Sequence, residues 1–373
     1  MNYFKVLKEV KTHKKPFHVA RALSAKYYLL LSAKTVVGVT GSVGKTTTTN
    51  AIRTALGKEA ISTTENLDSI FNIPITVLKS KKFKYLVLEM GVQYPKDMEF
   101  NSSIAPSDIV VFTQISPAHT QYLSSLEKIF TEKSKIITKK TKIVIYNYDD
   151  KLLREKFSKL NIPVIKYGIS KECDVRLSVE SQNLKNTKIN IYYQGEKFNI
   201  TTSLIGQHQC LSLGAAFAVG TFLGIDKKIL IKNLSKTKSA TNRFNVVKIA
   251  NADVIKDIYN SSPLALSNAI NFVNLQKHKT KIAILGDMLE LGKMSESEHI
   301  KIAKQLLNSS FDQVFTYGEE AQKIYSYLSS KNTKLKLTHL EKPFKLEQKK
   351  FDNSTLILVK GSHGMHMEDF FSS

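Results

Sequence analysis

The stretch from Val39 to Thr48, which reads VTGSVGKTTT, constrains the fold of this chain more than any other feature. It follows an apolar run typical of a β-strand and precedes a helical pattern. A strand, a glycine loop and a helix start in that order form a phosphate-binding loop, because glycines let backbone N–H groups surround an anion and the helix N-terminus adds partial positive charge. We expect Lys45 to reach the outer phosphates of a nucleotide, and Thr46 or Thr47 to offer a hydroxyl to Mg²⁺.

The loop is a variant of the general pattern. Val39 stands where that pattern has a glycine, five residues before Gly44, so the motif reads T-G-x-x-G-K-T-T. We predict that nucleotide contacts come from Thr40, Gly41, Ser42, Val43, Gly44, Lys45, Thr46 and Thr47.

Strands and helices alternate along the first part of the chain. β-type runs recur at 85–90, 108–113, 142–146 and 163–167, with a helical stretch at 126–138. Such alternation predicts an α/β fold with a mostly parallel sheet covered on both faces. From Asp174 to Ile205 the pattern changes to a period of two, which predicts a small antiparallel β insert before a helix of small residues at 211–223.

A second α/β series begins near Thr241. Its predicted strands are 246–249, 254–258, 281–285, 313–317 and 355–359, and its predicted helices are 264–274, 295–307 and 319–329. We therefore predict a helical extension over 1–34, a nucleotide-binding domain over 35–241 and a Rossmann-like domain over 242–373. The lysine-rich stretch 331–350 is expected to be a solvated, partly irregular surface.

The composition of the chain limits which classes of binding partner we expect. The chain of 373 residues has 55 Lys and Arg against 32 Asp and Glu, a net charge of +23. Because the lysines are spread along the whole chain, we attribute the excess to proteome bias and anionic small molecules, and expect no nucleic acid. Two cysteines exclude a disulfide framework. We expect a cytoplasmic monomer. Ala20, Leu23 and Tyr27 form an apolar stripe on a basic helix, which suits a membrane surface, but we favour packing of this segment on its own domain.

Several polar residues lie at predicted strand ends, where doubly wound sheets bind ligands. Glu89 ends a strand, and its carboxylate suits Mg²⁺. Asn147 begins Asn-Tyr-Asp-Asp after another strand and is a nucleotide candidate, with a β-turn as the alternative. His119 and Lys133, taken alone, are a loop histidine and a helix lysine. In the second half the candidates are Asp257, Tyr259, Asp287, Glu290, Lys360 and Ser362.

Together these segments resemble the Mur ligase family, most closely its branch that adds D-alanyl-D-alanine to a UDP-muramoyl tripeptide. The matches run in order from about Thr35 to Phe371. The most specific is the segment 285–292, Leu-Gly-Asp-Met-Leu-Glu-Leu-Gly. The others are the phosphate loop, Leu88–Gly91, Ala118–His119, Glu132–Lys133, Tyr259–Asn260 with Pro263, and Val359–Ser362.

The resemblance implies an ATP-dependent ligase that phosphorylates a substrate carboxylate and lets an amine attack the acyl phosphate. It assigns two Mg²⁺ ions to Thr46, Glu89, His119 and Lys133, with Lys133 carbamylated. It assigns ATP contacts to Arg243, Asp257, Tyr259 and Asn147 as well as the loop. Substrate contacts would come from Asn66, Asp287, Glu290, Lys360 and Ser362, and the catalytic residues would be Lys45, Lys133, His119, Arg243 and Asp257.

Departures from the family pattern concern the substrate. Only 34 residues precede the first predicted strand, so we expect no N-terminal UDP-binding domain and consider a separate subunit in its place. Asn66-Leu67-Asp68-Ser69 replaces an Asn-Leu-Asn-Asn segment. Other departures are Glu65, Gln209, Ser212, Lys256, Ser262 and His363. The substrate would be a peptide or nucleotide-sugar peptide; the alternatives are ligation of a folyl or poly-γ-glutamate acid, and a non-catalytic nucleotide-binding regulator.

Overall fold

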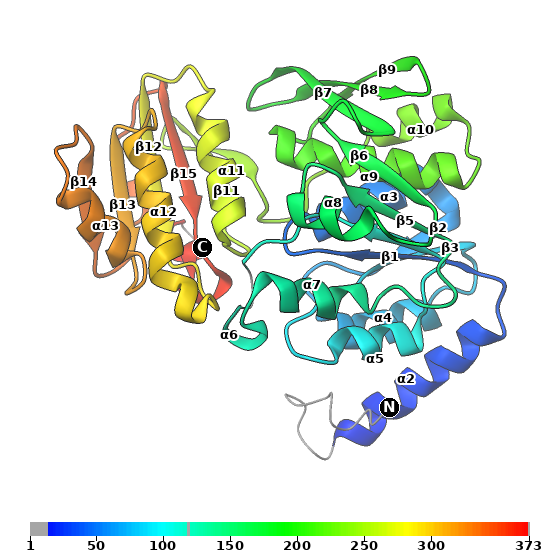
Figure 1. Cartoon of the computed structure of the whole chain (residues 1–373). Coiled ribbons are helices and arrows are strands. Elements are labelled where there is room, and N and C mark those ends of the chain that lie inside the picture. The colour runs from blue at the N-terminus through cyan, green and yellow to red at the C-terminus, as the bar shows by residue number, and fades with distance from the viewer. Residues whose placement is uncertain (1–13, 118–119, 372–373) are drawn as a thin grey trace. The chain divides into compact units, whose positions relative to one another are not determined.

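The computed structural model describes residues 14–117 and 120–371, which form two compact units (Figure 1). The first unit comprises residues 14–115, 125–182 and 186–240, and the second comprises 241–371 with two short pieces from earlier in the chain. Those pieces are 183–185 and the described part of 116–124. The chain therefore contributes to the second unit before it finishes the first.

The first unit contains a nine-stranded sheet in the order β2-β3-β1-β4-β5-β6-β7-β8-β9. Its parallel part is β1 (Thr35–Thr40), β2 (Ala60–Ser62), β3 (Tyr85–Glu89), β4 (Ile109–Phe112), β5 (Ile143–Asn147) and β6 (Val164–Gly168). The next strand, β7 (Val175–Gln182), pairs parallel with β6 and then carries the antiparallel strands β8 (Thr187–Tyr193) and β9 (Glu196–Thr202). The predicted parallel sheet with a β insert is confirmed.

Helices cover both faces of this sheet, as Figure 1 shows. On one side lie α3 (Lys45–Leu56), α9 (Gln207–Phe222) and α10 (Lys227–Leu234), and on the other α4 (Ser69–Leu78), α5 (Asp97–Ile104) and α7 (Leu126–Ser134). Shorter elements of this unit are η2 (Gly57–Glu59) and α8 (Lys151–Phe157), whereas the short helix α6 (Thr120–Leu123) belongs to the second unit. Because alternate strand residues point to opposite faces, Val37 and Val39 enter the core under α3 and α9 while Val36 faces the other side.

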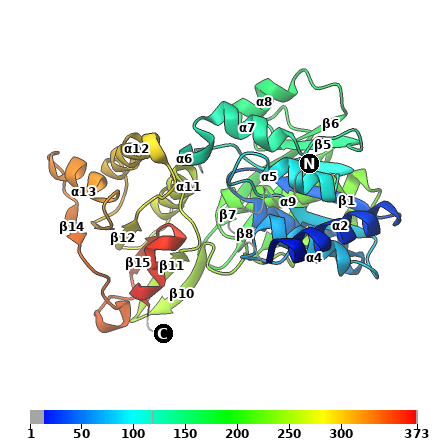
Figure 2. The same cartoon turned by 90° about the horizontal axis from the view of Figure 1, so that it is seen from below.

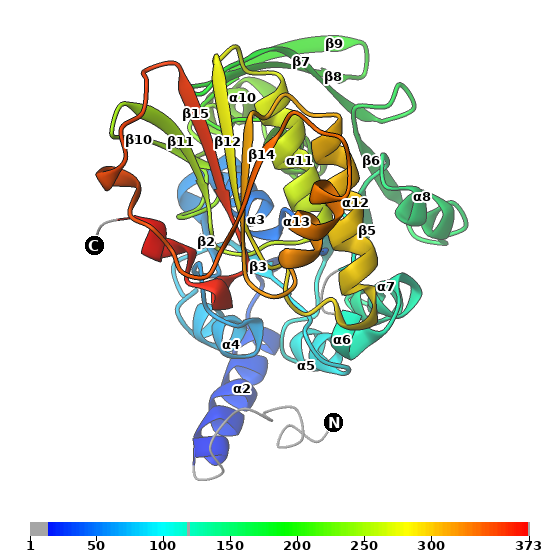
Figure 3. The ribbon, with the colours of Figure 1, turned by 90° about the vertical axis from the view of Figure 1, so that its left-hand side faces the viewer.

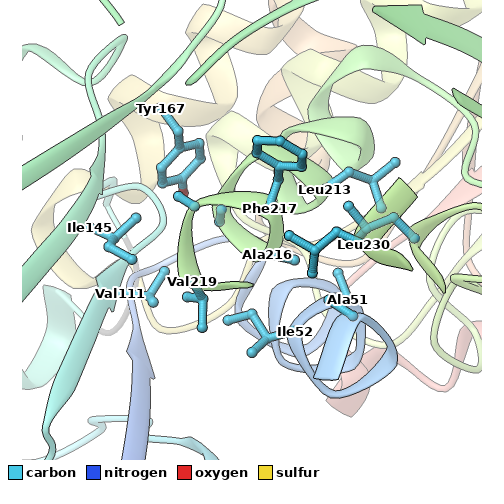
Figure 4. Packing of buried hydrophobic residues seen from close by; sticks show 14 of the residues in the cluster. Ala51, Ile52, Val111, Ile145, Tyr167, Leu213, Ala216, Phe217, Val219 and Leu230 are labelled. Carbon is cyan, nitrogen blue, oxygen red and sulfur yellow. The ribbon is translucent and has the colours of Figure 1, made fainter. Parts of the chain in front are cut away.

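Small residues let α9 pack tightly in that core (Figure 4). A Cβ added at Gly214 would lie 2.3 Å from Cδ1 of Leu177, and one at Gly220 would lie 2.3 Å from Cδ2 of Leu230. Phe217 of α9 is fully buried in the same cluster. A larger side chain at either glycine would force the facing leucine to shift, and the small-residue helix predicted from the sequence contributes many residues to this core.

The second unit contains a six-stranded sheet in the order β10-β11-β15-β12-β13-β14, parallel except for the edge strand β10. The strands are β10 (Asn245–Ile249), β11 (Ala252–Asp257), β12 (Thr280–Gly286), β13 (Gln313–Tyr317), β14 (Lys336–Leu340) and β15 (Thr355–Lys360). Its helices α11 (Pro263–Asn274), α12 (Ser295–Leu307) and α13 (Gln322–Ser329) lie on one side (Figure 3). The C-terminal segment lies on the other side (Figure 2), and Phe370 belongs to the same buried cluster as Ile282 and Ile357.

Four short 3₁₀ helices complete the second unit. They are η3 (Gly292–Met294), η4 (Leu346–Gln348), η5 (His363–Met365) and η6 (Met367–Phe370). The expectation that 331–350 is a solvated, partly irregular surface agrees with the structure, in which most of its residues are exposed or half-buried. The segment supplies β14, which pairs in parallel with β13, and Leu346 is fully buried.

The N-terminal helix α2 (Lys15–Leu30) packs on α4 and α5 of the first unit. Its buried residues are Ala22, Ala25 and Leu29. The segment therefore packs on its own domain, as favoured from the sequence, but through these residues and not through the stripe that includes Tyr27, which is 63% exposed. Small alanines give the closer contact, since they let the helix backbone approach its neighbours. None of the helices among the described residues is long and apolar enough to cross a bilayer.

Candidate functional site

Two glycines give the phosphate loop its shape. Gly41 has φ of +146°, and a Cβ there would lie 1.9 Å from Oγ1 of Thr113, so only glycine fits. Gly44 has φ of +85° at the N-cap of α3, where side chains other than glycine are strained. Lys45 then begins the helix, and its Nζ lies 3.4 Å from the carbonyl oxygen of Ser42. The loop therefore leads directly into a helix N-terminus, as the sequence predicted.

Hydrogen bonds fix the loop against the end of β4. The Ser42 N–H donates to the Gln114 carbonyl at 2.6 Å. The Thr113 hydroxyl bridges two loop carbonyls, that of Val43 at 2.6 Å and that of Thr40 at 3.2 Å. Since both attachments come from β4, the loop is held in shape before any nucleotide arrives.

A hydroxyl and a carboxylate meet beside this loop. Oγ1 of Thr46 donates to Oε2 of Glu89 at 2.8 Å. The backbone of Glu89 is fixed as well, because its N–H donates to the Thr63 hydroxyl and its carbonyl accepts from the Ser69 hydroxyl. Thr47 is 6% exposed. Hard oxygen donors on a rigid frame fit Mg²⁺, which usually takes one or two protein ligands and completes its shell with phosphate and water oxygens.

Lys133 is buried on α7, with 2% of its surface exposed. Burial lowers the pKa of its amine well below the ordinary value, and the cation of Lys45 lowers it further. The carboxylates of Glu89, Asp97 and Glu132 oppose this shift. Among the residues that the structure describes, none forms a hydrogen bond with the Lys133 amine. The surroundings therefore favour a neutral amine.

Asp97, at the start of α5, belongs to the same acidic surroundings. Burial raises its pKa to about 6, while the Tyr94 and Gln93 N–H groups, which donate to Oδ2 at 2.7 and 2.9 Å, work in the opposite direction. Sequence reasoning missed Asp97, since an acidic residue in the first turn of a helix is ordinary. Among the described residues, no three His, Cys, Asp or Glu side chains form a preformed metal cluster. His119 lies outside the described residues.

Two other candidates of the first unit are Asn147, the last residue of β5, and Asn66, which lies in a turn. Oδ1 of Asn147 accepts from the Asp149 N–H at 3.1 Å, which is a side-chain turn, and the residue is 1% exposed. Asp150 caps α8 and also accepts from the Ile115 N–H at 2.7 Å, at the end of β4. Asn66 is exposed with φ of +63°. A nucleotide role for Asn147 and a substrate role for Asn66 stay predictions.

In the second unit, strand ends bring a buried ion pair together. Asp257 of β11 and Lys360 of β15 are register partners, and Nζ of Lys360 lies 2.6 Å from Oδ2 of Asp257. The same ammonium donates to the Asn260 carbonyl at 2.8 Å, and the other Asp257 oxygen accepts from the Phe244 N–H. Lys360 is 1% exposed, so its charge is already satisfied within the unit.

The segment 285–292 is fixed by polar contacts of its own. Oδ1 of Asp287 accepts from the Ala321 N–H at 2.7 Å, and burial raises the pKa of this carboxyl. The Ser362 hydroxyl accepts from the Leu289 N–H at 2.9 Å. Glu290 has φ of +63°. Asp287 and Ser362 thus shape the loop, and substrate contact for them and for Glu290 stays a prediction.

The short helix α6 lies on this loop. The Gln121 N–H donates to the Glu290 carbonyl at 3.0 Å, and the Thr120 hydroxyl donates to the Leu291 carbonyl at 2.8 Å. A Cβ at Gly292 would lie 3.1 Å from Cα of Gln121. Nothing in the sequence signals this contact, because its partners are far apart along the chain.

Stacked side chains surround Arg243. Its guanidinium carbon lies 4.1 Å from the centroid of the Tyr259 ring, and that ring stacks on His363 at 6.0 Å. The Tyr259 N–H donates to the Asn242 carbonyl, which ties the start of the unit to the end of β11. The predicted residues Arg243, Asp257 and Tyr259 therefore lie on neighbouring elements.

Comparison with known proteins gives the family. The Mur ligase middle domain matches residues 39–220, and the Mur ligase, glutamate ligase domain matches residues 242–363. The chain is 32% identical over 355 residues to the UDP-N-acetylmuramoyl-tripeptide--D-alanyl-D-alanine ligase of Bacillus subtilis, covering 92% of this chain and 77% of the relative.

Solved structures agree. The crystal structure of MurF ligase from Thermotoga maritima in complex with ADP superposes with a TM-score of 0.83 at 27% identity, over 95% of this chain and 82% of that one. Folylpolyglutamate synthase from Thermotoga maritima shares the fold, with a TM-score of 0.67 at 14% identity. With both domains matched in order and one relative aligned over nearly the whole chain, this protein is a member of the Mur ligase family.

Proposed function

We propose that this chain is an ATP-dependent amide ligase that joins D-alanyl-D-alanine to the terminal carboxylate of a UDP-N-acetylmuramoyl tripeptide, releasing ADP and phosphate. The similarity to the Bacillus subtilis ligase over 92% of the chain carries the proposal. The intact phosphate loop, with Thr46 bonded to Glu89, supports it independently. Such chemistry uses ATP, so we place it in the cytoplasm.

The first step is transfer of the γ-phosphoryl group to the substrate carboxylate. It needs positioning and charge neutralisation more than covalent help. Loop N–H groups and the start of α3 would bind the phosphates, and Lys45 would neutralise charge that develops on the transferred group. Mg²⁺, when bound, would screen the phosphate oxygens, with Thr46 and Glu89 as its protein ligands and His119 as a further one. The amine then attacks the acyl carbon, and phosphate leaves.

Lys133 would enter this site as a carbamate. Burial and Lys45 favour its neutral amine, which is the form that attacks CO₂. The nitrogen would bond to the carbon of CO₂ and lose a proton, giving an anion able to bind a second Mg²⁺, which an ammonium does not bind. Bicarbonate enriched in ¹³C should give a carbamate signal in the NMR spectrum of the protein. The signal should be missing in Lys133→Met, and its presence in that variant contradicts the assignment.

The second unit would supply the remaining contacts. We assign ATP contacts to Arg243, Asp257 and Tyr259, and one to Asn147 from the first unit. Residues assigned to substrate are Asn66, Asp287, Glu290, Lys360 and Ser362. Asp287 and Ser362 would also position the loop 285–292, since their hydrogen bonds hold it within the unit. The UDP part of the substrate would bind outside the two described units, on another segment or a separate subunit.

One experiment tests the proposal. The purified chain is incubated with ATP, Mg²⁺, the muramoyl tripeptide and D-alanyl-D-alanine, and the product is identified by mass spectrometry. A mass corresponding to the pentapeptide, with ADP formed in equal amount, is expected. ATP binding without ADP release under every substrate combination would instead favour a regulatory role and overturn the proposal.

A second candidate is ligation of glutamate to a folyl or poly-γ-glutamate acid. It is favoured by the share of the folylpolyglutamate synthase that the chain covers, 92%, against 82% of the MurF ligase. Identity of 14% makes it the weaker candidate. Replacing D-alanyl-D-alanine by L-glutamate, and the tripeptide by a folate, in the same assay distinguishes the two.

A further inference from the structure

Helix α2 presents an apolar face to solvent, opposite to the face that packs on α4 and α5. Phe17, Tyr27 and Leu30 of the helix, and Leu31 at its C-cap, are 67, 63, 66 and 90% exposed. At 3.6 residues per turn these four positions fall within about 140° of one another, on the side away from the buried residue Ala25. Single exposed apolar side chains are normal, whereas four gathered on one helix mark an interaction surface.

Basic residues flank this face without acidic ones. The sequence from 14 to 34 contains no Asp or Glu, and it carries Lys14, Lys15, Arg21 and Lys26 besides Lys34. Lys34 is occupied, because its Nζ donates to the Ser80 and Phe83 carbonyls. The ion pairs formed among the described residues include none to Lys15 or Lys26. The sequence before the helix adds Lys5, Lys8 and Lys11 with one acidic residue, Glu9.

We propose that α2 docks the protein on an anionic lipid bilayer. Phe17, Tyr27, Leu30 and Leu31 enter the boundary between headgroups and acyl chains, while Lys15 and Lys26 pair with lipid phosphates. A helix of 16 residues is too short to span the bilayer and lies along its surface. A second copy of this chain is a poorer occupant, since its identical basic face would repel this one. The proposal does not depend on the ligase activity.

Vesicle co-sedimentation of the full chain tests the proposal. We expect binding to mixed phosphatidylcholine–phosphatidylglycerol vesicles, and little to phosphatidylcholine alone, with binding that falls as salt rises. The double variant Leu30→Ser, Leu31→Ser should bind at least about tenfold more weakly, because it removes apolar surface from the face. Lys15→Glu with Lys26→Glu should weaken binding about as much.

A matched control keeps the result specific. Ile229→Ser with Leu275→Ser removes two aliphatic side chains that are 53 and 65% exposed on other helices, and should leave vesicle binding unchanged. Thermal melting should be the same for all variants, which shows that they fold. Equal vesicle binding by wild type and the Leu30, Leu31 variant would overturn the proposal. So would self-association that this variant abolishes, in a protein that binds no vesicles, because the face would then join two copies.

Discussion

The ion pair between Lys360 and Asp257 yields a prediction in which the free energy of unfolding and the rate of ADP release respond differently to the same substitutions. The charged atoms lie 2.6 Å apart, and Lys360 is 1% exposed. At an effective dielectric constant of about 20, two unit charges at that distance attract each other by about 6 kcal/mol, and taking both out of water costs several kcal/mol. We therefore expect a coupling free energy of about 2–3 kcal/mol between the two side chains.

Single and double variants measure this coupling. Lys360→Met leaves the Asp257 carboxylate without its cation, and should lower the free energy of unfolding of β11 and β15 by about 3–5 kcal/mol. Asp257→Asn should cost less, because the Asn260 carbonyl still accepts from the ammonium. In the double variant neither charge remains, so its loss should fall short of the sum of the two single losses by the coupling energy.

Hydrogen exchange of the full chain, read by mass spectrometry on β11 and β15, gives these free energies. Lys248→Met is the matched control, since Lys248 pairs with Asp253 on the surface and its loss should cost less than about 1 kcal/mol. If Asp257 contacts ATP, the double variant should lose less stability than the sum of the single losses, while its rate of ADP release stays as low as that of Asp257→Asn. Additive losses, with a coupling below about 0.5 kcal/mol, would refute the reasoning.

Three further predictions address the site and the core. Glu89→Gln should slow ADP release at least about a hundredfold at fixed Mg²⁺, whereas the exposed control Glu59→Gln should not, and equal rates would remove the carboxylate from the metal site. Burial raises the pKa of Asp97 from 3.8 to about 6, so its contribution to stability is present at low pH and is lost as the pH rises from about 4 to 6. In Asp97→Asn the midpoint of urea unfolding should fall less over this pH range than in the wild type. An equal fall in both proteins contradicts the assignment. Gly220→Ala should destabilise the protein by about 1–3 kcal/mol in thermal unfolding, because its Cβ would clash with the Leu230 side chain. Leu230→Ala removes the clashing atoms, so the double variant should lose less stability than the sum of the two single losses. Additive losses would show that the clash is absent.

Local patterns made most of the fold predictable. The phosphate loop, the alternation of strands and helices, and the β insert after Asp174 are each written in a short stretch of sequence, so periodicity and glycine placement suffice to find them. β14 was not predicted because it is a short, partly exposed edge strand within a lysine-rich stretch, a pattern that resembles a loop. The face of α2 was misjudged because its buried residues are two alanines and Leu29, which fall outside the stripe chosen from the sequence.

The candidate site was predictable only in part, for a physical reason. Glu89 could be placed from its strand end, and Thr46 from the loop. The burial of Lys133 and the nearness of Asp97 depend on how α5 and α7 pack, which no spacing in the sequence encodes. Likewise, the pairing of Lys360 with Asp257 follows from strand order, since β11 and β15 are neighbours in the sheet but far apart along the chain.

The chain enters the second unit through α6 long before Thr241, and this bears on how the protein can be dissected. A fragment that starts at Thr241 would lose the donors that Gln121 and Thr120 provide to the Glu290 and Leu291 carbonyls. Such a fragment would contain the loop 285–292 without the helix α6 that is hydrogen-bonded to it. A chimaera with another family member should therefore exchange the α6 segment together with the C-terminal unit, so that both come from the same protein.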